Sequence, residues 1–375
     1  MFKPLGIRAM RVAAASANWR RLRLFPLSAS ALSLALGLYG GFIRFGIQLP
    51  GGARSIADFH GAFMISGFLG TVICLERAVA LGRVWPYAAP LLSGLGAIAL
   101  LTDVPRFGAL AFTSAGGVML AALSTTAARQ FSLFTLVISL GTACWIAGAL
   151  QWLYGGFTPA VTGWWLNFLV LTVAAERLEL SRMLDVSRLS QIAFAGATLL
   201  LLLGSGRGEF VESRAPLTAA GLLGYAAWLL RYDIARRTVR MLGQPRFSAV
   251  AILIGHSWLG VTGILLLVAP PGATAFSYDA SVHAITIGFT LSMIFGHAPI
   301  ILPAVTGIRV RFSPAAYAPL ILLQASLVLR IGGDFLESAD LRLASGIVTI
   351  AALAGYAVTL SLVTTMRASH RAVKF

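Results

Sequence analysis

Residues 280–303 read ASVHAITIGFTLSMIFGHAPIILP, a stretch without a single Asp, Glu, Lys or Arg. An apolar run of about 20 residues is long enough to cross a lipid bilayer as a helix. The rest of the chain shares this character, since 58% of its 375 residues are hydrophobic, only 11% are charged, and the mean hydropathy is +0.85. This composition excludes an ordinary soluble domain and predicts an all-α, polytopic membrane helix bundle.

Similar apolar runs, bounded by charges or by Gly and Pro, recur along the whole chain. They predict about twelve transmembrane helices, at residues 27–47, 56–75, 86–102, 108–126, 132–154, 161–175, 189–205, 216–230, 247–268, 280–303, 316–332 and 343–365. The chain is then a single transmembrane domain, residues 27–365. A basic cytoplasmic N-terminal segment, residues 1–26, precedes it, and a basic cytoplasmic tail, residues 366–375, follows it.

The distribution of positive charge supports an even number of spans. The chain has 29 Lys and Arg against 13 Asp and Glu, which gives a net charge of +16. If the N-terminus is cytoplasmic, the inner segments hold roughly three times as many Lys and Arg as the outer ones, as cytoplasmic loops do. Both termini are therefore expected in the cytoplasm. Because topology explains the charge, the lipid bilayer is the expected partner and nucleic acid is not.

Two Glu-Arg pairs lie 100 residues apart at the inner ends of the second and sixth expected spans. They are Glu76-Arg77 and Glu176-Arg177. Their spacing is compatible with a four-helix pseudo-repeat used three times, although Glu-Arg could also be a common ending at the inner face. Each pair is interpreted as a snorkelled ion pair, with a proton entry point or an anchor for haem propionates as alternatives.

Histidines are the residues that could carry chemistry, because ionisable groups inside spans are functional candidates. His60 and His283 each stand about four residues into a span that runs from outside to inside. Both imidazoles should lie just beneath the outer face, where two of them on separate helices can bind a haem iron from both sides. The alternative is a pair of interfacial histidines hydrogen-bonded to loops.

A second pair, His256 and His297, is expected at a common depth in the inner half. In ideal α-helical geometry His297 lies about 21 Å beyond His283 and faces nearly the same way. A second metal or haem at the inner pair would make a transmembrane electron conduit. The alternative is a histidine bonded to a carbonyl freed near Pro299 and Pro303, which are expected to break the helix.

Methionine and glycine accompany the histidines. Met64 shares a helix face with His60, and Met293 lies between His283 and His297. Thioether with imidazole suits copper, although apolar spans also contain Met for packing. Bare glycines could let a flat macrocycle approach the helices or could simply let the helices pack closely; they are Gly61, Gly67, Gly70 and Gly288.

Two motifs accompany the twelve spans, Asp58-Phe59-His60-Gly61 and His283-Ala284-Ile285-Thr286-Ile287-Gly288, the second followed by Met293 and Gly296-His297. Together they resemble the NnrS family, haem- and copper-containing membrane proteins of the bacterial nitric-oxide response. The family is related in architecture to subunit I of haem-copper oxidases. The resemblance implies that His60 and His283 are axial ligands of a b-type haem, that His297 is a further haem or copper ligand, and that the protein lies in the bacterial inner membrane.

The chain also departs from that family's pattern. Gly61, Ala62 and Phe63 stand between His60 and Met64, where the family usually has a second histidine with Glu and Met nearby. Spans six and seven lack the histidines that an oxidase-type copper centre would need. This puts a catalytic dinuclear site in doubt, and enzymatic activity is left open.

The leading expectation is a haem-binding, possibly copper-binding, protein of nitric-oxide or redox stress that binds a diatomic gas or transfers electrons. Its partner would be quinol or a redox protein. One alternative is a two-centre b-type cytochrome that uses His60 with His283 and His256 with His297. The other is a cofactor-free small-solute transporter, suggested by the repeat and by a broken helix near Pro299.

Overall fold

The computed structural model describes residues 5–50, 54–184, 186–205, 212–308 and 310–372, and these residues form helices and turns without a strand. The long helical segments are α1 (Leu5–Arg44), η1 (Ala62–Gly70) continued by α3 (Thr71–Leu81), α4 (Ala88–Leu101), α5 (Pro105–Arg129), α6 (Leu133–Gly155), α7 (Pro159–Ser181), α8 (Arg188–Gly204), α9 (Ala215–Tyr232), α11 (Gln244–Val268), α12 (Ser277–His283) continued by η5 (Ala284–Leu291) and α13 (Ser292–Thr306), α14 (Tyr317–Phe335) and α15 (Ala339–Ala372). Short helices α2 (Arg54–Asp58) and α10 (Ala235–Thr238) lie between them. Each predicted span overlaps one long segment.

Eight segments in the described part of the chain are long and apolar enough to cross a membrane. They are Leu22–Arg44, Ala62–Leu81, Pro105–Arg129, Leu133–Gly155, Gln244–Val268, Ser277–Thr306, Pro314–Phe335 and Ala339–Thr364. The apolar helices α4 and α8 are too short to be counted with these eight segments. The helices α7 and α9 are long enough, but their mean hydropathy is lower than that of the eight. The structure therefore shows an all-helical fold with several helices of membrane length, and the count of twelve crossings stays a prediction.

Helix boundaries follow local sequence signals. Ser132 closes a capping box at the start of α6, and the side chain of Ser187 accepts a hydrogen bond from the backbone of the first turn of α8. The second and tenth segments end at Gly82 and Gly307, whose φ values of 65° and 73° are left-handed and favour glycine. α6 and α8 therefore begin within a residue of the expected spans, at Leu133 and Arg188, whereas α1 begins at Leu5 and α7 ends at Ser181, well outside them.

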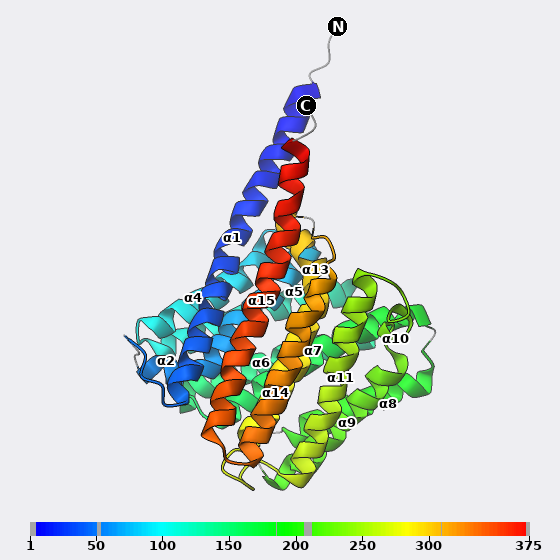
Figure 1. Cartoon of the computed structure of the whole chain (residues 1–375). Coiled ribbons are helices and arrows are strands. Elements are labelled where there is room, and N and C mark those ends of the chain that lie inside the picture. The colour runs from blue at the N-terminus through cyan, green and yellow to red at the C-terminus, as the bar shows by residue number, and fades with distance from the viewer. Residues whose placement is uncertain (1–4, 51–53, 185, 206–211, 309, 373–375) are drawn as a thin grey trace.

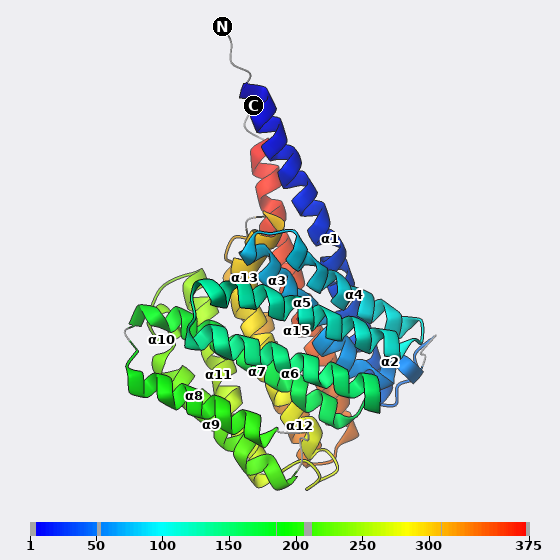
Figure 2. The same cartoon turned by 180° about the vertical axis from the view of Figure 1, so that it is seen from behind.

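Helices that follow one another in the chain pack as neighbours, as for α4 with α5, α5 with α6, α6 with α7, α8 with α9 and α14 with α15. The long helices α1 and α15 come close together and extend beyond the other helices at the end where α1 begins and α15 ends (Figures 1 and 2). In Figure 1, α14 and α11 follow α15 across the near side, and Figure 2 shows α5, α6 and α7 on the opposite side.

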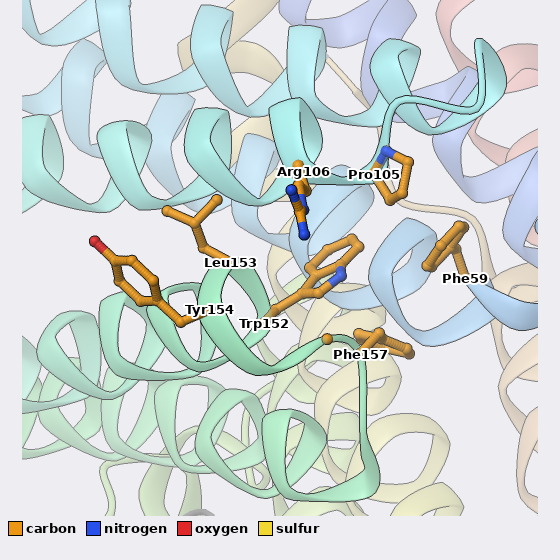
Figure 3. A pocket seen from close by; sticks show the side chains of 8 residues that line it. Phe59, Pro105, Arg106, Trp152, Leu153, Tyr154 and Phe157 are labelled. Atoms are coloured by element: carbon orange, nitrogen blue, oxygen red, sulfur yellow. The ribbon is translucent and has the colours of Figure 1, made fainter.

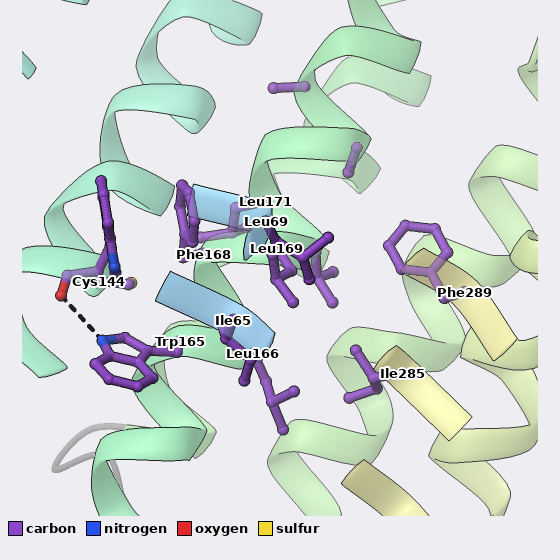
Figure 4. Packing of buried hydrophobic residues seen from close by; sticks show 14 of the residues in the cluster. Ile65, Leu69, Cys144, Trp165, Leu166, Phe168, Leu169, Leu171, Ile285 and Phe289 are labelled. Atoms are coloured by element: carbon purple, nitrogen blue, oxygen red, sulfur yellow. Dashed lines mark hydrogen bonds between the residues drawn. The ribbon is translucent and has the colours of Figure 1, made fainter. Parts of the chain in front are cut away.

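One large buried cluster joins the second, sixth and tenth segments. Ile65 of η1, Leu166 and Leu169 of α7, and Ile285 and Phe289 of η5 all belong to it (Figure 4). Removing such side chains from water is the main favourable contribution to packing outside the membrane, and close contact is the main one within it. The cluster holds the two π-helical segments in fixed positions around α7.

The expected break at Pro299 and Pro303 is wrong, because α13 continues through both prolines to Thr306. The irregular part of the tenth segment lies earlier, where η5 is π-helical from Ala284 to Leu291. The ideal α-helical rotation used to relate His283 to His297 therefore does not apply to the eight residues of η5. The sixth segment, α7, is α-helical throughout, and the threefold repeat stays a prediction.

Candidate functional site

His60 and His283, the pair expected near the outer face and called the outer histidines below, both present the same ring nitrogen to the backbone. His60 lies just before η1, and its Nδ1 is 2.6 Å from the carbonyl oxygen of Gly37 on α1. His283 ends α12, and its Nδ1 is 2.9 Å from the carbonyl oxygen of Asp279. A carbonyl oxygen only accepts hydrogen bonds, so Nδ1 is the donor in each ring and Nε2 keeps its lone pair. This is the tautomer that a metal ligand needs.

The structure brings the two outer histidines near each other. His60 is among the groups that act electrostatically on His283, although they lie on separate segments. Both residues are partly buried, with 16% of the His283 side chain exposed. Neither Nε2 has a hydrogen-bond partner among the residues that the structure describes. Each ring therefore keeps an Nε2 lone pair that a metal could use, and the common depth of the two histidines stays a prediction.

His283 directly precedes η5 and His60 stands two residues before η1, and these are the two π-helical segments in the described residues. Such segments are rare and often mark functional sites. Two serine side chains donate hydrogen bonds to backbone carbonyl oxygens of η1. Ser33 donates to the carbonyl of Phe63 at 2.8 Å, and Ser93 donates to the carbonyl of Ser66 at 2.9 Å. Neighbouring helices α1 and α4 therefore hold η1 in its shape.

An ion-pair cluster fixes the start of the tenth segment, and sequence reasoning missed it. The Asp279 carboxylate accepts two hydrogen bonds from Arg330 of α14, at 2.6 and 2.8 Å, and lies 3.4 Å from Nδ1 of His283. Arg342 of α15 donates to Asp334 at 2.8 Å. No pattern in the sequence pairs either arginine with an aspartate. The pairing shows instead that α12, α14 and α15 are cross-linked beside His283.

Met64 packs on α1, against the same glycine whose carbonyl accepts the hydrogen bond of His60. A Cβ added at Gly37 would lie 2.5 Å from Sδ of Met64, so the sulfur occupies the space that this glycine leaves. The glycines nearest the histidines serve close packing in the same way. A Cβ at Gly67, Gly70 or Gly288 would clash with Ser33, Trp145 or Trp258 respectively, whereas at Gly61 it would meet only Phe157, at 3.6 Å.

The inner histidines also lie near each other, in different surroundings. His297 donates from Nδ1 to the carbonyl of Met293 at 2.7 Å, and its Nε2 accepts from Arg177 at 3.3 Å. His256 is fully buried, and neither ring nitrogen has a hydrogen-bond partner in the described chain. The nearest carboxylate oxygen is Oδ2 of Asp233, 3.6 Å from Nε2 of His256.

The Glu-Arg pairs form ion pairs between helices, which sequence neighbours could not reveal. Arg77 of α3 pairs with Glu176 of α7. Arg177 donates to both carboxylate oxygens of Asp233, at 2.6 and 2.5 Å. Arg177 is only 3% exposed, so the expected snorkelled arrangement is wrong for this residue. Burial alone would raise the pKa of Asp233, but the hydrogen bonds and charge of Arg177 hold that pKa below its ordinary value.

The candidate ligand residues differ in the metal or cofactor that they could bind. Within the described residues, no three or more His, Cys, Asp or Glu side chains are grouped so that they could hold a metal ion. A haem iron needs only two axial ligands from the protein, and His60 with His283 supply two free Nε2 atoms.

Comparison with known proteins gives one match. No curated protein and no solved structure matches the chain. The model of one protein family, described as a domain of unknown function (DUF8744), matches residues 21–365. That match runs from within α1 to near the end of α15 and includes all four histidines discussed above. The chain therefore belongs to the DUF8744 family.

Proposed function

We propose that this protein is a polytopic inner-membrane protein of the NnrS/haem-copper type that holds a b-type haem between His60 and His283. The observation that carries the proposal is the shared tautomer, in which each Nδ1 donates to a helix carbonyl and each Nε2 stays free. An N–H···O=C bond of this kind fixes ring orientation and raises the basicity of the ligating nitrogen. When bound, the haem would supply one-electron chemistry.

Two axial imidazoles favour electron transfer over gas binding. With His60 and His283 in both axial positions, a diatomic gas could bind only by displacing one of them. Both rings are tied to the backbone, and His283 is further held by Asp279 and Arg330. We therefore propose electron transfer in nitric-oxide or redox stress, with quinol or a redox protein as the partner.

A copper or second haem ligand role for His297 has less support. Its Nε2 accepts a hydrogen bond from Arg177, which is itself bound to Asp233. His297 would have to give up this bond before it could bind a metal. The proposal consequently places one haem in the outer half of the bundle, with twelve membrane crossings and both termini in the cytoplasm.

The test is a reduced-minus-oxidised absorption spectrum of the purified protein, with a haem count on the same sample. We expect one b-type haem per chain, lost in His60→Ala and in His283→Ala. His297→Gln, on the same long segment as His283, is the matched control and should keep the haem. A spectrum unchanged in both alanine variants would overturn the assignment, and two haems per chain would favour the two-centre cytochrome.

A further inference from the structure

A pocket opens one residue away from His60, at the end of the bundle where α5 begins and α6 ends. Its volume is about 240 Å³, and Phe59, Trp152 and Phe157 line it together with Arg106 (Figure 3). A cavity of about 150 Å³ accepts a benzene ring. The pocket is therefore large enough for one substituted ring, and none of the proposed haem ligands lines it.

The walls of the pocket are aromatic. The Trp152 indole lies 5.5 Å from the ring of Phe59 and 4.9 Å from the ring of Phe157, and those two phenyl rings are 5.9 Å apart. Phe112 and Trp165 pack on Trp152 from the core side. These contacts hold flat faces in place, and flat faces favour a flat ring as ligand.

The polar groups of the pocket are mostly donors. Trp152 is 4% exposed, and its Nε1–H has no hydrogen-bond partner in the described residues. An indole N–H normally finds an acceptor, so this one is available to a ligand in the pocket. Arg106 is exposed at the rim, with no carboxylate within ion-pair distance among the residues described. Tyr154, 85% exposed, carries the only hydroxyl among the lining side chains.

The surroundings of the pocket are apolar. Val104 and Phe107, on either side of Pro105 and Arg106, are 49% and 52% exposed. Val and Phe side chains favour the lipid interior over water, so these two suit contact with lipid. A ligand that reaches the pocket through them would be membrane-soluble, flat, and equipped with acceptor oxygens.

We infer that this pocket binds the headgroup of a quinone, with its ring among Phe59, Trp152 and Phe157 and its carbonyl oxygens facing Trp152 Nε1–H and Arg106. A quinone meets each requirement of the pocket, since it has a flat ring, carbonyl acceptors and an apolar tail. An anionic lipid headgroup would satisfy Arg106 but would leave the aromatic walls and the indole N–H unused. The inference concerns binding and does not require the haem.

The test is calorimetric titration of the full-length protein, in nanodiscs of phosphatidylcholine, with a ubiquinone that carries one isoprene unit. We expect saturable binding that weakens about tenfold in Trp152→Phe, which keeps a ring but removes the donor, and about tenfold in Arg106→Gln. Arg129→Gln is the matched control, because Arg129 is exposed at the other end of the same helix. It should bind as the unmodified chain does.

Two outcomes would overturn the inference. One is the absence of saturable quinone binding, or equal binding by Trp152→Phe, Arg106→Gln and the unmodified chain. The other is binding of phosphatidylglycerol that depends on Arg106, without binding of the quinone. That result would assign the rim of the pocket to a lipid headgroup. Loss of haem in His60→Ala with retained quinone binding leaves the inference standing, whereas haem that survives this change refutes only the proposed function.

Discussion

The hydroxyl of Tyr356 on α15 donates a hydrogen bond of 2.6 Å to the carbonyl oxygen of Phe295 on α13. Pro299, four residues after Phe295, has no N–H, so this carbonyl lacks its usual helical donor. The rings of Phe295 and Tyr356 also stack, with centroids 4.0 Å apart. A neighbouring helix thus supplies the bond that the proline removes, and α13 continues instead of breaking.

Replacing Tyr356 by Phe should lower the free energy of unfolding by about 1–3 kcal/mol, because it leaves the Phe295 carbonyl buried without a donor. In a Pro299→Ala background the amide of residue 299 can bond the same carbonyl, and the loss should fall below about 1 kcal/mol. Unfolding of the four proteins in detergent measures this double-mutant cycle. Equal losses in the two backgrounds would contradict the explanation.

Replacing Asp233 by Asn should lower the free energy of unfolding at neutral pH by about 3–5 kcal/mol, because Arg177 would stay buried without its counter-charge. Asp340→Asn is the control, since Asp340 is exposed in the first turn of α15. It should change stability by less than about 0.5 kcal/mol.

The pH dependence of this difference has a defined sign. Because the pKa of Asp233 is lower in the folded protein, its contribution is fully present above the unfolded pKa of about 4 and is lost as the pH falls through the folded value. The stability gap between the unmodified chain and Asp233→Asn should therefore narrow below about pH 4. Detergent unfolding curves from pH 7 to pH 3 measure the gap, and a constant gap would argue against a charged Asp233.

Leucine at each inner histidine should have opposite effects. His256→Leu should raise the free energy of unfolding by about 1–2 kcal/mol, because both nitrogens are buried without partners. His297→Leu should lower it by about 1–3 kcal/mol, because it leaves a buried donor of Arg177 without its acceptor. Both are measured by unfolding in the same detergent. Marked destabilisation by His256→Leu would show that His256 has a bonding partner in the working protein.

Alanine at Gly67 should destabilise the protein by about 1–3 kcal/mol, because the added Cβ would lie 2.1 Å from Oγ of Ser33, the residue that bonds η1. Gly117→Ala is the control, since a Cβ there meets nothing within 4 Å and Ala is the better helix former. It should be neutral or stabilising by up to about 1 kcal/mol. Thermal unfolding of the two variants measures both changes in stability. Unchanged stability in Gly67→Ala would refute close packing at η1.

The positions of the helices could be read from the sequence because apolar runs and capping residues act locally. Ser132, for example, caps α6 at the residue where the fifth span was expected to begin. The sequence also placed His60 and His283 at one depth, since depth depends only on distance from a span end. Their actual proximity depends on how the helices pack, and only the structure shows it.

The interactions that position the site could not be predicted from the sequence. Arg177 and Asp233 are 56 residues apart, and their pairing depends on α7 lying beside the end of α9. Arg330 and Asp279 are joined in the same way, across α14 and α12. The π-helices escaped prediction because both segments are almost uniformly apolar, so no polar and apolar alternation distinguishes i+5 from i+4 hydrogen bonding there.

The π-helices after His60 and His283 have an evolutionary consequence. Each turn that closes after five residues instead of four takes in one extra residue, so η1 and η5 hold more residues than α-helices of the same length would. An alignment without gaps against a protein that is α-helical there would place the histidines and the helices that follow them out of register. Distant relatives should therefore be sought by allowing a one-residue gap within η1 and within η5.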